Sequence, residues 1–438
     1  MTPTAALTSR QEIERLQATR LQAVLDAAGQ TNLFWRAKYA AAGVDLTKFS
    51  GLGDLSRLPF CTKAEILADQ LAHPPYGTNL TWPIERYSRL HQTSGTTGTP
   101  VRWLATPESW PALLKSWSEL YALMGVTRQD RFFFPFSFGP FLGFWAAFEG
   151  ANRLGHLCIP GGGLSSTARL TLMLENQATI VCCTPTYALR LIEVAAEQQI
   201  DLSGSAVRAV LVAGEPGGNI PAVRQRIETG WGASVFDHWG MTELGPLAIE
   251  AAGDPGSLYL LESACIAEII DPQTDSAARP GDEGELVITN LCRSGSPLIR
   301  YRTGDRVRAT PPGERPEAKA PYLRLDGGII GRVDDMLTIR GNNVYPSALE
   351  AVIRQFDAVA EFRIVVCHVR SMQHLRIEVE PASAAVAAGQ TADLARQIAE
   401  AIKDRWNFNA DVVLVEVGGL PRFELKARRL VTENVSGT

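Results

Sequence analysis

Closely spaced metal ligands are missing from this sequence. Its six histidines and seven cysteines are scattered, and no C-x-x-C pair occurs. Structural zinc sites usually take their ligands from such pairs, so we expect no zinc. Cysteines in apolar contexts such as TIVCCTP (179–185) are typical of reduced core thiols, which favours a cytoplasmic location.

An excess of charge of one sign is also missing. The formal net charge is −5, and no run of like charges forms a tail. The composition therefore gives no reason to expect nucleic acid or an anionic membrane as a partner. The first thirty residues carry charges throughout, so they predict an amphipathic helix rather than a secretory signal.

A long hydrophobic run without helix breakers is the third absence. Residues 132–148 (FFFPFSFGPFLGFWAAF) are uncharged, but they include two prolines and two glycines. The stretch is shorter than the roughly 20 residues that a transmembrane helix needs. It predicts a buried strand, an aromatic loop and the start of a helix.

The chain of 438 residues predicts more than one domain. From about 131 to 215, strand-like and helix-like segments alternate, which is typical of βαβ units on a parallel sheet. Ligands of such sheets bind beyond the carboxyl ends of the strands, which favours the loops at 184–187 and 213–218 as site loops. Short β-rich segments follow residue 255. From 331 onward the pattern is that of a small α+β unit.

A stretch of hydroxyl and glycine residues, TSGTTG (93–98), lies between two β-like runs. Consecutive backbone N–H groups in such a turn form a concave site for anions, and hydroxyls add donors. The G-K-[ST] ending of a P-loop is lacking, and Thr99 follows instead. An ordinary hairpin loop is the alternative interpretation.

Five motifs then follow one another along the chain. They are HQTSGTTGTP (91–100), HWGMTE (238–243), YRTGD (301–305), GRVDDMLTIRGNNVYP (331–346) and PRFELKARRL (421–430). In order and spacing they resemble the adenylate-forming superfamily of acyl-CoA synthetases, adenylation domains and luciferases. LPFCTKAEIL, AGEP and RGNNVYPSALE resemble the phenylacetate–CoA ligase branch.

The resemblance implies an α/β fold in two parts. A large N-terminal adenylation domain (1–330), with mixed and parallel sheets and helices, would bind ATP and the acid. A small, mobile α+β domain (331–438) would act as a lid that turns about a hinge near Asp334. Gly341 would line a pantetheine tunnel in the second orientation.

The implied ATP site draws on four of the motifs. The loop 93–98 would hold the β- and γ-phosphates, Thr242 would contact the α-phosphate, and Glu243 would bind Mg²⁺, which favours carboxylate and phosphate oxygens. Asp305 would accept hydrogen bonds from the ribose hydroxyls. The residues implied to bind ATP or AMP are Thr93, Ser94, Gly95, Thr96, Thr97, Gly98, Gly214, Glu215, Pro216, Asp237, His238, Trp239, Asp305 and Arg332.

The implied catalytic residues are Lys426, Glu243 and Thr242, with Lys426 stabilising charge on the α-phosphate and the attacking carboxylate. The implied acid-binding residues are Phe136, Phe141, Ala213, Gly214, Gly240 and Met241. Taken singly, Asp305 also fits a turn, Glu243 a helix start and Lys426 a solvated cation. The ordered set outweighs these separate interpretations.

Three departures from the family pattern stand out. Trp239 occupies a position where the family usually has tyrosine, no Cys and His pair follows the Thr-Glu motif, and the usual glycine before Lys426 is lacking. The second departure leaves zinc without support. For the 3′-phosphate of CoA, the sequence offers only Arg293, Arg340 and Arg370 as partners.

The sequence therefore predicts an AMP-forming acid–thiol ligase that activates an aromatic carboxylic acid with ATP and Mg²⁺ and transfers it to coenzyme A. One alternative keeps the adenylation but passes the acyl group to a carrier-protein pantetheine or an amine, as in secondary metabolism. Another is a non-catalytic protein that binds a nucleotide or an acid on the same fold. A homodimer is left open.

Overall fold

The computed structural model describes residues 9–93, 99–311, 321–333, 335–339, 342–369, 372–423 and 427–433. Several predicted site residues lie outside these ranges. They are Ser94, Gly95, Thr96, Thr97, Gly98, Asp334, Gly341 and Lys426, together with Arg340 and Arg370.

The chain begins with helices, as the charged and apolar spacing predicts. Ser9 and Glu12 form a capping box at the start of the first helix, whose apolar face is buried. Buried Asn32 ends this helix and caps the next by accepting from the N–H of Trp35. The elements are α1 (Arg10–Thr31), α2 (Leu33–Ala41), η1 (Leu46–Lys48), η2 (Leu52–Arg57), α3 (Lys63–Ala72) and η3 (Ile84–Arg86).

A hairpin, two helices and a strand follow. The two β-like runs on either side of the glycine-rich stretch pair as antiparallel strands, while residues 94–98 between them lie outside the described residues. The elements are β1 (Arg89–Gln92), β2 (Arg102–Ala105), α4 (Ser109–Leu123), β3 (Arg131–Phe134) and α5 (Gly143–Arg153). Residues 132–148 thus form a buried strand, a loop and a helix start, as predicted. Within the described ranges, no helix is long and apolar enough to cross a membrane.

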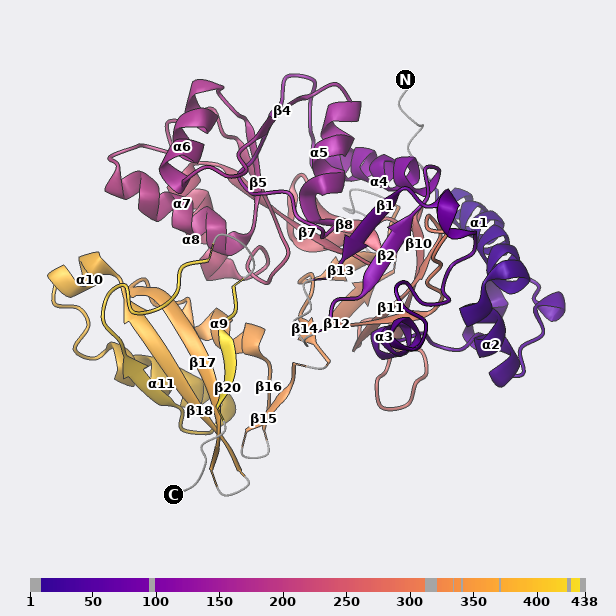
Figure 1. The fold of residues 1–438 in the computed structure, drawn as a ribbon. Helices are drawn as coiled ribbons and strands as arrows, with labels where there is room; N and C mark the ends of the chain where they lie inside the picture. Colours follow the sequence, from indigo (N-terminus) through magenta and orange to yellow (C-terminus); the bar gives the residue numbers. More distant parts are fainter. Residues whose placement is uncertain are drawn as a thin grey trace.

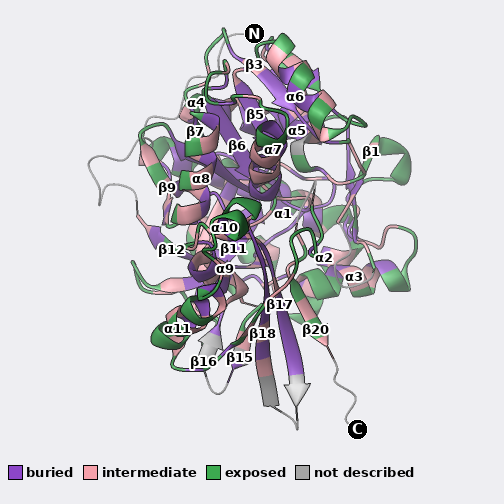
Figure 2. Ribbon diagram, turned by 90° about the vertical axis from the view of Figure 1, so that its left-hand side faces the viewer, coloured by how far each residue is buried: buried purple, intermediate pink, exposed green. Residues whose placement is uncertain are grey.

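The predicted βαβ alternation is confirmed. Five parallel strands lie in the order β4-β3-β5-β6-β7 and connect through helices that pack on the sheet. The elements are β4 (Leu157–Pro160), α6 (Ser166–Glu175), β5 (Ile180–Cys183), α7 (Pro185–Glu197), β6 (Ala209–Ala213), α8 (Pro221–Trp231) and β7 (Ser234–Met241). Strands β5 and β6 are buried on both faces, as parallel strands covered by helices are (Figure 2).

Antiparallel strands extend the same sheet beyond β7 in the order β8-β9-β13-β12-β11-β10, and β14 pairs with β12. The elements are β8 (Gly245–Ala251), β9 (Asp254–Leu260), β10 (Cys265–Ile270), β11 (Glu283–Asn290), β12 (Tyr301–Thr310), β13 (Arg324–Asp326) and β14 (Gly331–Arg332). The β-rich texture after residue 255 predicts three of these strands, β10, β11 and β12.

The C-terminal domain has its own four-stranded sheet, in the order β19-β18-β17-β20, and its own apolar core. The elements are β15 (Leu337–Ile339), β16 (Asn342–Val344), α9 (Pro346–Ile353), β17 (Val359–Val369), β18 (Met372–Pro381), α10 (Ser383–Ala387), α11 (Leu394–Trp406), β19 (Asp411–Leu414) and β20 (Leu430–Glu433). The sequence pattern does not predict α10 or β20. The domain lies beside α8 (Figure 1), where Arg226 donates to the carbonyl of Val359 at 3.2 Å.

Candidate active site

The predicted site loops lie at the carboxyl ends of the parallel strands. Strands β6 and β7 pair so that Ala213 stands opposite His238. Gly214 follows with φ +93°, a conformation that glycine adopts without strain. Gly218 lies so close to Asp237 that an added Cβ would stand 2.6 Å from its carboxyl group. The loop at 213–218 and the start of the HWGMTE motif (238–243) therefore lie side by side at one edge of the sheet.

Next to these loops, β12 and β14 bring three predicted residues together. Their pairing sets Asp305 opposite Arg332. The indole N–H of Trp239 donates to Oδ2 of Asp305 at 2.9 Å, and Nη1 of Arg332 donates to Oδ1 at 3.0 Å. Both oxygens of this buried carboxylate are therefore oriented by N–H donors, one from an indole and one from a guanidinium.

Thr242 and Glu243 lie in the turn after β7. Glu243 is buried, and its Oε1 accepts from the hydroxyl of Tyr301 on β12 at 3.0 Å. Burial, reinforced by the Glu243 carboxylate, raises the pKa of Tyr301 well above its usual value, so this hydroxyl stays a donor. The Glu243 carboxylate is of the ligand type that Mg²⁺ prefers, since this ion commonly takes one or two carboxylates plus phosphate oxygens, and its role as a Mg²⁺ ligand stays a prediction.

Arg293 supports this turn from behind. Its Nη1 donates to the backbone carbonyls of Thr242 at 2.7 Å and Glu243 at 2.8 Å. The side chain is only 2% exposed, and burial lowers its pKa to about 10, which leaves it charged at neutral pH. Its burial and its use of Nη1 behind the turn do not favour Arg293 among the three arginines that the sequence offers for the 3′-phosphate of CoA.

Several buried polar atoms gather between Arg293 and the β1–β2 hairpin. In the described part of the chain, Nη2 of Arg293, Nε1 of Trp103 and Nδ1 of His91 have no hydrogen-bond partner. His91 and Trp103 stand opposite each other in the hairpin, and the Arg293 guanidinium lies 5.9 Å from the Trp103 ring. Burial, with help from Arg293 and Arg89, lowers the pKa of His91 to about 4, so its ring is neutral.

The hairpin closes at Thr93. The backbone N–H of Thr93 donates to the carbonyl of Val101 at 3.0 Å, and its hydroxyl accepts from the N–H of Val101 at 3.1 Å. The preceding residue, Gln92, donates its N–H to the carbonyl of Pro140 in the aromatic loop at 2.7 Å. The remainder of the predicted phosphate loop lies outside the described residues, so its role stays a prediction.

The aromatic loop forms a cluster of rings. Phe136 is buried and packs against Phe134 and Phe138, and Phe138 packs against Trp145 with ring centres 4.6 Å apart. The ring of Phe141 lies against the backbone of two glycines, Gly139 and Gly143. Half-buried Met241, at the end of β7, packs on the same core as this cluster, and Gly240 pairs with Pro246. A role of these residues in acid binding stays a prediction.

Two further predicted residues are buried on β7. Nδ1 of His238 donates to the carbonyl of Ala248 at 2.7 Å, and burial lowers its pKa to about 4. Burial, together with the nearby Glu250 carboxylate, raises the pKa of Asp237 to about 8. Glu250 is itself held by Arg224 and by the N–H of Asp237.

The two predicted residues that follow Gly214 differ in their surroundings. Pro216 is exposed. The carboxylate of Glu215 accepts one backbone N–H from the large domain and one from the C-terminal domain.

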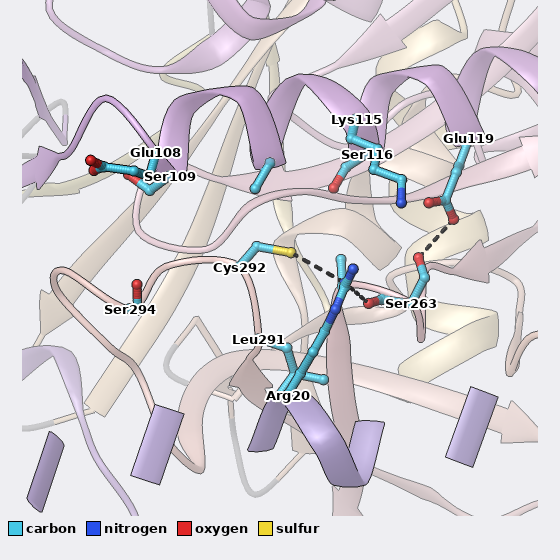
Figure 3. A pocket seen from close by; sticks show the side chains of 12 residues that line it. Arg20, Glu108, Ser109, Lys115, Ser116, Glu119, Ser263, Leu291, Cys292 and Ser294 are labelled. Carbon is cyan, nitrogen blue, oxygen red and sulfur yellow. Dashed lines mark hydrogen bonds between the residues drawn. The ribbon is translucent and has the colours of Figure 1, made fainter. Parts of the chain in front are cut away.

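A cavity of about 260 Å³ lies between α1, α4 and the loop that carries Cys292 and Ser294 (Figure 3). Arg20 from α1 and Lys115 from α4 point into it from opposite walls, and Cys292 and Ser294 line it. Arg293 does not line it, because its side chain points toward the turn at Thr242. Among the described residues, no group of three or more His, Cys, Asp and Glu side chains comes together to hold a metal.

Comparison with known proteins identifies the family to which the chain is similar. The family model of AMP-binding enzymes matches residues 15–292, and the model of the C-terminal domain of AMP-binding enzymes matches residues 341–434. The chain is 32% identical to the phenylacetate-coenzyme A ligase of Escherichia coli strain K12 over 431 residues, which is 96% of this chain and 94% of that protein.

Two solved structures of 2-hydroxyisobutyryl-CoA ligase differ in how well they match. The postadenylation state with 2-HIB-AMP gives a TM-score of 0.91 at 29% identity, covering 97% of this chain and 90% of that one. The thioesterification state with 2-HIB-AMP and CoA gives a TM-score of 0.71 at 29% identity, covering 97% of this chain and 91% of that one. The arrangement of this chain is therefore closer to the postadenylation state.

Replacing Arg293 tests its role behind the turn. Arg293→Met removes two charge-assisted hydrogen bonds, and we expect the free energy of unfolding to fall by about 3 kcal/mol in chemical denaturation. The exposed pair of Arg86 and Glu108 offers a control, and Arg86→Met should change it by less than about 0.5 kcal/mol. Equal, small effects of both variants would contradict a supporting role for Arg293.

Asp237 makes stability depend on pH. Its pKa is about 8 in the folded chain against the ordinary value of 3.8 for an exposed aspartate, so the folded state keeps a proton that the unfolded state loses. Its stabilising contribution is present below about pH 4 and is lost as the pH rises to about 8. Thermal melts of Asp237→Asn should show a flatter pH dependence over this range. Asp282→Asn, at an exposed position, should leave the profile unchanged.

Proposed function

The chain belongs to the AMP-binding enzyme family, and on that premise we propose that it activates an aromatic carboxylic acid with ATP and transfers the acyl group to coenzyme A. The observation that carries the proposal is the convergence of Trp239, Glu243 and Asp305 around β12, beside the hairpin of the glycine-rich loop. Near-complete overlap with a phenylacetate-coenzyme A ligase favours an aromatic acid, as does the cluster of aromatic rings.

The first half-reaction joins the acid to AMP. A carboxylate oxygen of the acid attacks the α-phosphorus of ATP, and the bond to the leaving pyrophosphate breaks. Asp305 accepts hydrogen bonds from the ribose hydroxyls, while the loop 93–98 holds the departing phosphates. Thr242 and Lys426 donate to the oxygens on which charge develops, and such fixed donors lower the barrier. Mg²⁺ held by Glu243 would neutralise phosphate charge.

The second half-reaction forms the thioester. The thiol of CoA attacks the acyl carbon of the mixed anhydride, and AMP leaves. We assign residues 1–330 to ATP and acid binding and 331–438 to the lid, with the hinge near Asp334 and Gly341 at the pantetheine tunnel. The pairing of β14 with β12 supports a hinge after Arg332, because residues up to Arg332 still belong to the large sheet. A cytoplasmic location, a homodimer and a place in secondary metabolism are further parts of the proposal.

Product analysis tests the proposal directly. The purified protein is incubated with ATP, Mg²⁺ and phenylacetic, benzoic, hydroxybenzoic, aminobenzoic or 2-hydroxyisobutyric acid, with and without CoA, and products are identified by mass. We expect an acyl-CoA of one aromatic acid. Lys426→Ala should lower acyl-AMP formation at least about 100-fold, since it removes a charge that acts in the transition state. Lys403→Ala, at a distant helix end, is the control.

Other products would contradict parts of the proposal separately. Acyl-AMP that accumulates whether or not CoA is present indicates a carrier protein or an amine as the acceptor. Turnover of 2-hydroxyisobutyric acid alone overturns the aromatic substrate class. The absence of any acyl-AMP, together with binding of nucleotide, would favour a non-catalytic protein.

Trp239 is expected to tune ribose binding through Asp305. Trp239→Phe keeps an aromatic ring but removes the N–H that orients Oδ2. Loss of one hydrogen bond to a charged group predicts a KM for ATP that is about tenfold higher. With 2′-deoxy-ATP the loss should be smaller, because one ribose hydroxyl no longer depends on that carboxylate. Equal losses for both nucleotides would mean that Trp239 acts by stacking alone.

A further inference from the structure

The two domains meet at the first turn of α7. Thr186 and Glu215 belong to the large domain at this point, and Ala427 and Arg429 belong to the C-terminal domain. Thr186 is buried, and Glu215 is half-buried. Lys426, the predicted catalytic lysine, directly precedes Ala427 in the sequence. The contacts of this small cluster therefore include a residue that is adjacent in sequence to the predicted catalytic lysine.

Glu215 bridges the domains with a single carboxylate. Its Oε1 accepts from the backbone N–H of Thr186 at 2.9 Å, and its Oε2 accepts from the backbone N–H of Ala427 at 2.6 Å. The first contact lies at the N-terminal end of α7, where the helix dipole favours a negative charge. The second is a charge-assisted bond to the residue next to Lys426, and such bonds are about twice as strong as neutral ones.

Arg429 adds a second bond across the same interface. Within its own domain it is held by Glu361, at 2.8 and 3.0 Å, and by Glu350 at 3.3 Å. Its Nη2 also donates to the hydroxyl of Thr186 at 3.0 Å. The guanidinium is 9% exposed, so it reaches Thr186 as a fixed group rather than as a mobile surface side chain. Thr186 thus receives one contact from each domain.

Both bonds exist only while the domains are docked in this way. The arrangement matches the postadenylation state of 2-hydroxyisobutyryl-CoA ligase better than its thioesterification state. A turn of the small domain about residues 333–335 would separate Ala427 from Glu215 and Arg429 from Thr186. The contacts are therefore specific to one of the two arrangements.

We propose that Glu215 is a positioning residue that holds the segment carrying Lys426 in place for adenylation, through its bond to the backbone of Ala427. The inference rests on the proposed function and deepens it. It differs from the sequence prediction for Glu215 in one respect: the carboxylate acts on the lysine segment and not on the nucleotide.

The test separates the two half-reactions. Glu215→Gln keeps the size of the side chain, but its amide offers one acceptor where the carboxylate offers two. We expect the kcat for acyl-AMP formation to fall about tenfold, the equivalent of ~1.4 kcal/mol, with the KM for ATP unchanged within about twofold. Thioester formation from supplied acyl-AMP and CoA should keep the wild-type rate, because that step uses the other arrangement.

A control variant and a second interface variant accompany Glu215→Gln. Glu193 lies 3.7 Å from Arg422 across the same interface, with both side chains about one-third exposed, so Glu193→Gln should leave both half-reactions unchanged. Thr186→Val removes the acceptor for Arg429 but keeps the backbone N–H that Glu215 binds. It should slow acyl-AMP formation in the same direction as Glu215→Gln, and it replaces that variant if the latter does not fold.

Hydrogen exchange gives a readout that needs no turnover. In the wild-type protein the amide of Ala427 should be protected, and in Glu215→Gln it should exchange at least about tenfold faster, while amides of β17 stay unchanged. Wild-type protein that forms no acyl-AMP would defeat the proposed function, and the exchange measurement would still decide whether Glu215 holds the segment.

Three outcomes would overturn the inference. A KM for ATP that rises at constant kcat would place the Glu215 carboxylate on the nucleotide. Equal slowing of both half-reactions would show a general structural role. Unchanged exchange at Ala427 in Glu215→Gln would show that the bond does not hold the lysine segment.

Discussion

The pairing of β12 with β14 is the constraint on which the candidate site depends. It sets Asp305 opposite Arg332, and β12 also carries Tyr301 beneath Glu243. Alternate residues of β12 are buried, so Tyr301, Thr303 and Asp305 all point to the same side of the sheet. A shift of one residue in this pairing would turn the carboxylate to the opposite face. Strand β12 also contacts the two residues from the HWGMTE motif, because Asp305 accepts from Trp239 and Tyr301 donates to Glu243.

Several ionisable side chains are buried in the site, and in each case hydrogen bonds, an opposite charge or a retained proton offsets the cost of burial. Arg293 is stabilised by hydrogen bonds to two backbone carbonyls and by the nearby charge of the Glu243 carboxylate. Glu250 is held by Arg224, and Asp237 beside it retains a proton near neutral pH. Taking charges out of water costs several kcal/mol per ion unless hydrogen bonds replace the lost solvent. Such groups are therefore held in fixed positions, which suits a site that must orient several reacting parts.

The sequence predicts what local patterns encode. The βαβ alternation and the strand, loop and helix start at 132–148 are evident from residues close together in the chain, and the structure confirms them. The bond from Trp239 to Asp305 joins residues 66 positions apart, and no local pattern encodes it. The burial of Arg293 is not evident from the sequence either, because an arginine is normally exposed. The short, half-exposed β20 lacks the apolar run that identifies a strand, so only its parallel pairing with β17 reveals it.

The hydrogen bond from Gln92 to Pro140 has a thermodynamic consequence. It joins the backbone just before the glycine-rich stretch to the backbone of the aromatic loop, so the two segments are held together by a direct hydrogen bond. If the nucleotide and the acid bind at these two segments as proposed, a change in the position of one segment on binding would be transmitted to the other through this bond. Linkage would make such an effect reciprocal: whatever factor the acid adds to the affinity for the nucleotide, the nucleotide adds to the affinity for the acid. Because the bond joins two backbone groups, substitution of side chains would leave it in place.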